Sequence, residues 1–401
     1  MPRSSPETPL RTGFTTGANA CAAAVAAARA LAGLPLQAWE GPLPALTADR
    51  YDVLAGAVTV AIPNGEHVRF PVRTLTVAPG RARASVVKDG GDDPDCTHRA
   101  EIWAEVEPAD DGVVRFVRGE GVGVVTRPGL GIPVGAPSIT APPRENIAAE
   151  ILGVLPGGAR VTLGIVDGEA LARRTLNARL GVEGGLSILG TTGIVHPYST
   201  AAFRASVTQA IDVAVANGLD EVVLTTGGRS ERFAQDLLPA LPEVAFVQMG
   251  DFVGHALAHA SALGIRTATL CGMIGKLSKM ADGRTMTHAA GSEVDCALLA
   301  EIARAVGADD AAAAAITAAN TGRHVQEIVQ EARLDAFFDA LCERAAVMLG
   351  AHLAGRPRPA DAPPMALRVL LTDFSGPLLG AYPPGVARPG DASPLLPDAA
   401  P

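Results

Sequence analysis

The sequence lacks three features by which whole classes of protein are recognised. None of its five cysteines stands in a C-x-x-C pair, so their spacing indicates neither a zinc site nor a disulfide framework. Lys and Arg number 33 against 42 Asp and Glu, and this net charge of −9 argues against a nucleic-acid-binding protein, which needs a basic face. The longest early apolar run, Ala20 to Ala28, is alanine-rich and ends at Arg29, unlike a signal peptide or a membrane-spanning helix. We therefore expect a cytoplasmic protein that has neither a membrane nor a nucleic acid as partner.

The chain has ample apolar material for more than one core. Its 401 residues are 48% hydrophobic, which favours two domains. We expect a sheet-rich α+β domain over residues 1–142 and an α/β, Rossmann-like domain with a helical C-terminal part over 143–376. The Pro- and Gly-rich stretch 377–401 is typical of a disordered tail.

The first domain is expected to combine one buried helix with antiparallel strands. Thr15 or Thr16 can cap a helix that runs to about Ala32, and its alanines permit close packing. Alternating apolar residues on both sides of Asn64-Gly65 predict a β-hairpin. Further strands are predicted over 82–88, 101–107 and 113–118.

In the second domain apolar strand-like runs alternate with helical patterns. A helix is expected from Pro142-Pro143 to about Leu155, and another over Ser199–Asn217. The alternation predicts a doubly wound, mostly parallel sheet. Its predicted strands are 161–166, 186–189, 221–224, 244–248 and 267–270. A further strand is expected over 368–371, after a helical stretch from about 292 to 354.

Three polar or glycine-rich segments are too dense in such residues to serve packing alone. The first is the loop from Lys88 to His98, which carries Asp89, Asp92, Asp93 and Asp95. Short-loop carboxylates beside a histidine could hold a hard cation, so a metal site formed by Asp92, Asp93, Asp95 and His98 is one interpretation. Asx turns that only stabilise the loop are the other. The remaining two segments are Gly119–Gly135 and Gly184–Val195.

A glycine turn followed by an acidic residue indicates where a nucleotide-like cofactor could bind. The strand at 221–224 leads into Thr225, Thr226, Gly227 and Gly228, and Asp251 follows Gly227 by 24 residues. In nucleotide-binding βαβ units an acidic residue at about this distance accepts the ribose hydroxyls. Thr191 and Thr192, in another turn after a predicted strand, are equal candidates for contact with cofactor or substrate.

Together with Leu10–Gly17, these segments resemble the cobalt-precorrin-5B C-1 methyltransferases of anaerobic cobalamin biosynthesis. The resemblance runs from about Leu10 to Thr287-His288 and covers four motifs in the family's order. It implies transfer of a methyl group from S-adenosylmethionine to ring carbon C-1 of an anionic cobalt tetrapyrrole, cobalt-precorrin-5B. Cobalt would then belong to the substrate, with no metal held by the protein.

The resemblance also implies roles for individual residues. His98, with Asp93 and Asp95, would lie over the macrocycle and either accept a proton or orient the ring. Cationic side chains would meet the substrate carboxylates. The substrate-binding candidates are Thr15, Thr16, Lys88, Asp89, Arg127, Arg144 and Lys276.

Two other functions compete with methyl transfer. A metal-dependent hydrolase would use Asp92, Asp93, Asp95 and His98, and a non-catalytic corrinoid-binding protein would hold the pigment without turnover. The sequence leaves open the oligomeric state, a homo-oligomer included, and which strand-end loop holds the donor.

Overall fold

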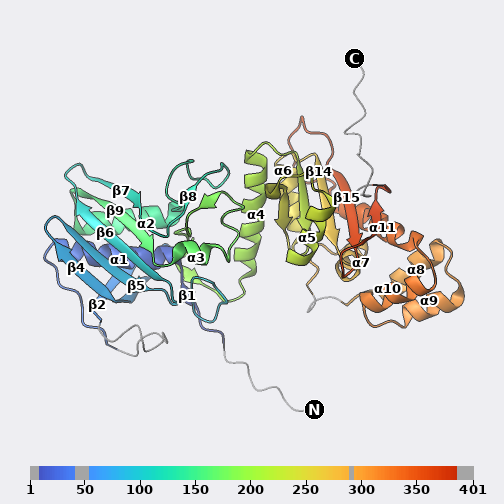
Figure 1. The fold of residues 1–401 in the computed structure, drawn as a ribbon, viewed down its shortest axis with the longest axis horizontal. Coiled ribbons are helices and arrows are strands. Elements are labelled where there is room, and N and C mark those ends of the chain that lie inside the picture. The colour runs from blue at the N-terminus through green and yellow to red at the C-terminus, as the bar shows by residue number, and fades with distance from the viewer. Residues whose placement is uncertain (1–8, 41–53, 289–292, 386–401) are drawn as a thin grey trace, which may run out of the picture. The chain divides into compact units, whose positions relative to one another are not determined.

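The computed structural model describes residues 9–40, 54–288 and 293–385. They divide into two compact units, the first ending at Thr200 and the second beginning at Ala201. The helices and strands of both units are labelled in Figure 1.

The first unit is built on a five-stranded mixed sheet in the order β4-β5-β6-β9-β7. Only the β7–β9 pair is parallel. The helices of the unit are α1 (Thr16–Leu31), α2 (Ala141–Val154) and α3 (Gly168–Ala172). Its strands are β1 (Gly13–Phe14), β2 (Gly56–Ala61), β3 (His67–Val72), β4 (Thr74–Ala78), β5 (Arg81–Val87), β6 (Glu101–Pro108), β7 (Val113–Arg118), β8 (Val124–Val125), β9 (Gly158–Ile165), β10 (Val182–Glu183) and β11 (Ile194–Val195).

Helix α1 forms the centre of this unit's core. Thr15 is its N-cap, since its side chain accepts a hydrogen bond from the Ala18 amide, and every residue from Thr16 to Ala28 is buried. The run of alanines gives the helix a thin outline, which lets it pack on β5, β6 and α2 at once. The predicted helix is thereby confirmed, as is the hairpin formed by β2 and β3.

The second unit carries a five-stranded sheet in the order β13-β12-β14-β15-β16, in which only β16 is antiparallel. Its strands are β12 (Glu221–Thr225), β13 (Phe246–Gln248), β14 (Thr267–Gly272), β15 (Ala366–Thr372) and β16 (Leu378–Tyr382). Its helices are α4 (Thr200–Ala216), α5 (Gly228–Leu237), the 3-10 helix η2 (Glu243–Ala245), α6 (Val253–Ala262), α7 (Ile274–Ala281), α8 (Cys296–Ala305), α9 (Asp310–Thr317), α10 (Gly322–Glu331) and α11 (Ala336–Leu353).

Helices cover both faces of this sheet, as a doubly wound arrangement requires. Val222 and Leu224 face a large core that includes residues of α4, α6, α7 and α11. Val223, between them, faces a small core with Ala234 of α5. The mostly parallel sheet, the strand near 368–371 and the helix over 199–217 are thus confirmed.

Three expectations about the organisation are corrected. The compact units divide after Thr200, not after residue 142, because α2 packs on α1 and β9 pairs with β6 and β7. The strand predicted over 161–166 therefore lies in the first sheet. The segment 186–189 forms no strand in the described structure, only isolated bridges from Leu186 to Val122 and from Ile188 to Ile139. Residues 378–382 form β16 rather than part of a disordered tail, while residues 386–401 lie outside the described part of the chain.

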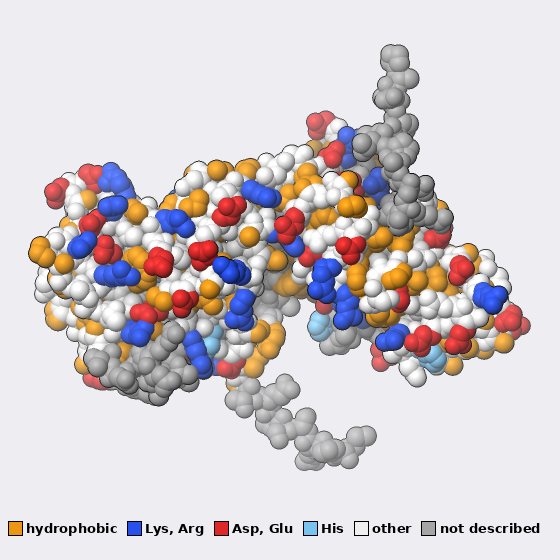
Figure 2. All heavy atoms as spheres, viewed as in Figure 1, with side chains coloured by type: hydrophobic (Ala, Val, Ile, Leu, Met, Phe, Trp, Pro, Cys, Tyr) orange, Lys and Arg blue, Asp and Glu red, His pale blue; other side chains and the backbone are white. Residues whose placement is uncertain are grey.

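The surface and helices add two observations. Basic and acidic side chains are interspersed over the face drawn in Figure 2. None of the helices in the described ranges combines the length and apolar character needed to cross a bilayer.

Candidate active site

The segment Leu10–Gly17, here called the N-terminal motif, lies beside the Gly184–Val195 segment in the first unit. Strand β1 pairs antiparallel with β11, with Gly13 opposite Val195. The pairing continues into α1, because the Thr15 amide donates to the Gly193 carbonyl at 3.0 Å and the Gly17 amide to the Leu189 carbonyl at 2.9 Å. Residues more than 170 positions apart in the sequence thus form one continuous structure at the N-terminus of α1.

The loop from Lys88 to His98, here called the acidic loop, contacts the side of the N-terminal motif that faces away from β11. The Phe14 amide donates to the Asp89 carbonyl at 2.7 Å, and the Asp92 amide to the Arg11 carbonyl at 2.9 Å. The Arg11 guanidinium forms an ion pair with the Asp89 carboxylate. The backbones are so close that a Cβ on Gly13 would lie 2.1 Å from the Gly90 carbonyl carbon. Only glycine fits at Gly13 without a shift of the loop.

The Gly119–Gly135 segment joins the same assembly through the Leu186–Ile188 stretch. The Gly123 amide donates to the Leu186 carbonyl at 2.8 Å, and the Leu186 amide donates to the Gly121 carbonyl at 2.9 Å. The four motifs singled out in the sequence therefore meet in one region. This convergence makes the region the candidate active site.

Thr15 and Thr16 lie buried beneath this region and do not form an open binding surface. Both are buried, and the Thr15 hydroxyl is engaged as the α1 cap. The Thr16 hydroxyl lies 3.1 Å from the Ser187 carbonyl and accepts from the Leu189 amide at 2.9 Å. Their hydroxyl groups thus tie α1 to the glycine-rich turn.

Lys88 is buried beneath the acidic loop, with 1% of its surface exposed. Its ammonium donates to Asp95 Oδ2 at 2.5 Å, while Asp95 Oδ1 accepts from the Thr97 amide and hydroxyl, each at 2.7 Å. Burial alone would raise the pKa of the Asp95 carboxyl, but the Lys88 charge and these hydrogen bonds hold it below its ordinary value. The pair anchors the loop from within.

His98 has one ring nitrogen engaged inside the loop. Its Nδ1 accepts a hydrogen bond from the Gly90 amide at 3.0 Å and lies 3.9 Å from Asp89 Oδ1. Burial lowers the pKa of the imidazole, and the charges of Arg99, Lys88 and Arg11 act in the same direction, against the opposite effect of Asp89. The ring is therefore neutral, with its proton on Nε2, because Nδ1 must keep its lone pair for the Gly90 amide.

The four side chains of the suggested metal site are turned to different partners. Asp93 Oδ1 accepts from the Tyr198 amide at 3.0 Å, and Asp92 Oδ2 from the Arg11 amide at 2.7 Å. Asp95 is bound to Lys88 and His98 to Gly90, as described above. Within the described ranges, no three His, Cys, Asp or Glu side chains are grouped so that they could hold a metal ion. The geometry favours the loop-stabilising interpretation.

Two arginines of the first unit retain donors for a ligand. Arg144, in the first turn of α2, donates through Nη2 to the Ile139 carbonyl at 3.0 Å. Its Nε is buried and has no hydrogen-bond partner in the part of the chain that the structure describes. Arg127 is half-buried, with its stem packed against Gly181.

Thr191 and Thr192 lie on an exposed turn. The Thr192 hydroxyl accepts a hydrogen bond from the Ile194 amide at 3.2 Å, which shapes the turn. The Thr192 carbonyl accepts one from the Asn64 amide at 3.1 Å. The Thr191 side chain is exposed next to it.

In the second unit the predicted glycine turn lies at the carboxyl end of β12. Thr225 is fully buried, and its hydroxyl donates to the Val247 carbonyl of the neighbouring strand at 3.3 Å, so this side chain serves the sheet. Gly227 is the N-cap of α5, and Gly228 is exposed at its first turn. Backbone amides at such a turn are available to a ligand.

Asp251, just beyond the carboxyl end of β13, belongs to a cluster with two lysines. It forms an ion pair with Lys276, and its Oδ1 also accepts from the Thr287 hydroxyl at 3.0 Å. The ammonium groups of Lys276 and Lys279 each donate to the Thr287 carbonyl at 3.3 Å. Burial, and next the charge of Lys279, lowers the pKa of Lys276.

Three members of these clusters are not among the site residues predicted from the sequence. Arg11 stands within the N-terminal motif, but its position gave no sign that it pairs with Asp89. Lys279 is more buried than Lys276, with 7% of its surface exposed. Thr287 is fully buried at the edge of the resemblance. Each depends on contacts between segments that no local pattern reveals.

Comparison with known proteins places the chain in a family. The family model described as CbiD matches residues 3–197, and the one described as "CbiD, C-terminal domain" matches residues 286–383. A Thermus thermophilus protein is 48% identical over 91% of this chain and 92% of its own length. The chain belongs to the CbiD family. The four motifs that meet around α1 lie within the first of these matched regions.

Other members of the CbiD family show the same extent of similarity. A Leptospira interrogans protein is 45% identical over 86% of this chain and 90% of its own. The Leptospira protein and the Thermus protein are both named cobalt-precorrin-5B C(1)-methyltransferase. A crystal structure of a cobalamin biosynthesis protein (cbiD) from Archaeoglobus fulgidus is 24% identical, with a TM-score of 0.35, over 80% of this chain and 84% of that one.

Proposed function

We propose that the protein methylates ring carbon C-1 of cobalt-precorrin-5B with S-adenosylmethionine to give cobalt-precorrin-6A. The observation that carries the proposal is the convergence of four separate motifs on the N-terminus of α1. Over 91% of its length the chain is 48% identical to a protein of that name. Cobalt enters as part of the substrate.

Methyl transfer from a sulfonium to carbon needs no nucleophile from the protein. The electron-rich macrocycle attacks the methyl carbon, the bond to sulfur breaks, and the electron pair leaves with the thioether. The protein's task is to align the two reactants and exclude water. Well-oriented reactants reach effective molarities on the order of 10⁵ M or more, which supplies much of the required acceleration.

We assign substrate recognition to the first unit. Arg144, with its buried Nε free of a partner among the described residues, and the half-buried Arg127 would bind carboxylate arms of the tetrapyrrole. Lys88, buried beneath the loop and bonded to Asp95, is assigned an indirect role in which it holds Asp95 in position. Asp89, paired with Arg11, fixes the loop against the N-terminal motif in the same way.

His98 is assigned an orienting role. Since Nδ1 accepts from the Gly90 amide, Nε2 carries the proton and can donate it in a hydrogen bond to the substrate. Of the two roles that the sequence allowed, this arrangement favours orientation of the ring over acceptance of a proton. Asp93 contributes by holding the Tyr198 backbone.

We assign the methyl donor to the carboxyl edge of the second-unit sheet. The turn with Gly227 and Gly228 offers backbone amides. Asp251 Oδ2 has no hydrogen-bond partner among the residues that the structure describes, so it is available to ribose hydroxyls. Lys276 serves chiefly to fix the Asp251 carboxylate. The exposed turn at Thr191 and Thr192 is the alternative donor site.

A turnover assay tests the proposal. The protein is incubated with S-adenosylmethionine and reduced cobalt-precorrin-5B, and mass spectrometry follows the tetrapyrrole. A gain of one methylene unit that depends on the donor supports methyl transfer. A stable complex without mass change indicates a corrinoid-binding protein, and hydrolysis that requires an added divalent cation indicates the metal-dependent alternative.

A further inference from the structure

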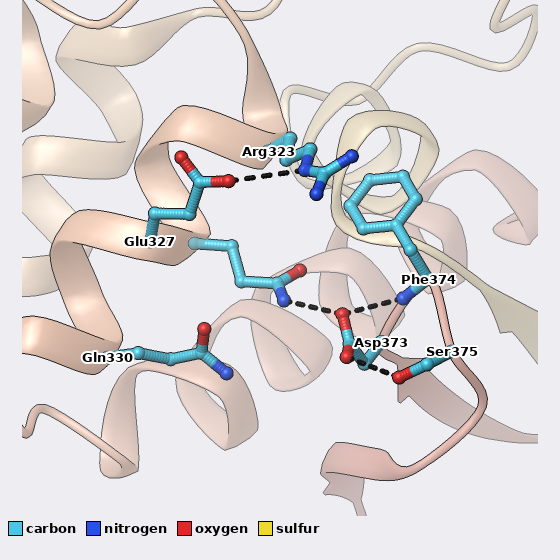
Figure 3. A pocket seen from close by; sticks show the side chains of 7 residues that line it. Arg323, Glu327, Gln330, Asp373, Phe374 and Ser375 are labelled. Carbon is cyan, nitrogen blue, oxygen red and sulfur yellow. Dashed lines mark hydrogen bonds and ion pairs between the residues drawn. The ribbon is translucent and has the colours of Figure 1, made fainter.

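A pocket of about 380 Å³ lies in the second unit, between α10 and the loop that follows β15. The loop begins at the carboxyl end of a strand of the parallel sheet, at the edge where ligands bind in open α/β sheets. Figure 3 shows the side chains that surround it. The lining residues are Arg323, Gln326, Glu327, Gln330, Asp373, Phe374 and Ser375.

Gln326 presents an unsatisfied hydrogen-bond acceptor in this pocket. Its side-chain Nε2 donates to Asp373 Oδ1 at 2.7 Å. Because a carboxylate only accepts hydrogen bonds, this contact fixes the orientation of the Gln326 amide, with Nε2 toward Asp373 and Oε1 away from it. The residue is 4% exposed, and Oε1 is buried with no hydrogen-bond partner among residues 9–40, 54–288 and 293–385. A buried acceptor of this kind calls for a donor from a ligand.

The charged groups around Gln326 indicate what that ligand carries. Asp373 Oδ1 accepts from the Phe374 amide at 2.6 Å and Oδ2 from the Ser375 hydroxyl at 2.7 Å, so the carboxylate is held in its ionised form. Arg323 donates through Nε to Glu327 at 3.2 Å, and its guanidinium carbon lies 5.4 Å from the Phe374 ring centre. The pocket thus offers an acceptor beside a carboxylate, and a guanidinium with further donors beside them.

We propose that this pocket binds the α-amino-acid head group of the methyl donor, with the ammonium on Gln326 Oε1 and the carboxylate on Arg323. The assignment rests on the proposed function. It agrees with the order of the strands, since β14 alone separates β12, which leads into Gly227, from β15.

Ligands that contain or lack the head group test the assignment. Calorimetry compares S-adenosylmethionine with 5′-methylthioadenosine, which keeps the adenosyl part, and with L-methionine. In the wild-type protein we expect the donor to bind at least about tenfold more tightly than 5′-methylthioadenosine, because hydrogen bonds to charged groups are among the stronger ones.

Two pocket variants and one control sharpen the test. Gln326→Leu and Arg323→Gln should each weaken binding of S-adenosylmethionine about tenfold and leave 5′-methylthioadenosine unchanged. The Arg323 side chain is 69% exposed, so its replacement should not disturb folding even if Gln326→Leu does. Glu331→Leu, at an exposed position of α10 outside the pocket lining, should bind both ligands as the wild type does.

The possible results separate this assignment from the proposed function. Methylated product together with donor binding that is indifferent to Arg323→Gln would overturn the pocket assignment alone, and so would equal losses for both adenosyl ligands. L-Methionine that binds without competing with S-adenosylmethionine would show a separate amino-acid site and also overturn it. Failure of the wild-type protein both to bind the donor and to form product would overturn the proposed function itself.

Discussion

The amide nitrogen of Gly90 lies 3.0 Å from Nδ1 of His98 and donates a hydrogen bond to it. This contact joins the two ends of the acidic loop and fixes the neutral tautomer of the ring. The position of Gly90 is constrained in turn, because a Cβ there would lie 3.3 Å from both His98 Nδ1 and Lys88 Nζ. The chemistry available to His98 is therefore decided by the shape of its own loop.

His98→Asn should separate the loop contact from the ring's other nitrogen. The asparagine oxygen can accept from the Gly90 amide, but nothing replaces Nε2–H. We expect turnover to fall while the affinity for S-adenosylmethionine is unchanged, measured by single-turnover methyl transfer and by calorimetry. A general base would contribute roughly 10²–10⁴ in rate, so a loss that large would favour proton acceptance instead. Transfer at the wild-type rate with saturating substrate would exclude a chemical role.

The same variant should alter how stability depends on pH. Burial lowers the pKa of His98 from 6.5, so between the two values the unfolded chain binds more protons than the folded one. The contribution of neutral His98 to stability is fully present above pH 6.5 and is lost as the pH falls toward the lowered pKa of the folded state. Burial shifts the pKa of His255 and His352 in the same direction. Melting temperatures between pH 8 and 5.5 should thus fall less steeply in His98→Asn than in the wild type, and parallel curves would contradict this account.

Lys88→Met should destabilise the protein rather than weaken substrate binding directly. The change leaves the Asp95 carboxylate without its cation beneath the loop, and loss of one partner of a buried ion pair costs about 3–5 kcal/mol. Because Asp95 is 22% exposed at its side chain, the lower end of that range is expected. Chemical denaturation measures the change. If the variant has wild-type stability but a raised Michaelis constant for the tetrapyrrole, Lys88 instead binds the substrate directly.

Arg144→Gln and Arg127→Gln should raise the Michaelis constant for the tetrapyrrole. Each removes a charge-assisted contact to a carboxylate, and such contacts contribute about 1.5–3 kcal/mol. High salt should weaken tetrapyrrole binding of the wild type in the same direction. The matched control is Arg81→Gln, at an exposed position of β5. Equal losses of donor and tetrapyrrole affinity would point to collapse of the loops instead.

Asp251→Ala should weaken binding of S-adenosylmethionine much more than binding of the tetrapyrrole. A ribose hydrogen bond to a charged acceptor contributes about 1.5–3 kcal/mol. Asp236→Ala changes an exposed aspartate of α5 in the same unit and serves as the control for calorimetry. Unchanged donor affinity in a folded Asp251→Ala protein would move the assignment to the turn at Thr191 and Thr192.

Two glycine-to-alanine substitutions should have opposite effects. At Gly13 a Cβ would lie 2.1 Å from the Gly90 carbonyl carbon, so Gly13→Ala must displace the acidic loop and should reduce both stability and turnover. Gly153, in α2, has nothing within 4 Å of its Cβ position. Gly153→Ala should therefore stabilise the protein by about 0.4–1 kcal/mol, through a less flexible unfolded chain and better helix propensity. Thermal denaturation compares the two.

The sequence by itself determined the local elements and the family. The cap at Thr15, the alanine-rich helix behind it, the hairpin around Asn64-Gly65 and the strand–helix alternation after residue 200 were all predicted, since each depends on neighbours a few positions away. Sequence motifs also singled out the four segments that the structure brings together around α1.

Only the tertiary structure decided which partners these elements take. An apolar strand such as β9 fits a parallel or a mixed sheet equally well, and its pairing with β6 and β7 is fixed by long-range hydrogen bonds. The direction of Lys88 under its loop and the cluster of Asp251 with two lysines depend likewise on residues distant in the chain. So does the Gln326 oxygen, which has no partner in the described part of the chain. Burial and partners set the charge and reach of a side chain, and both arise only when the chain has folded.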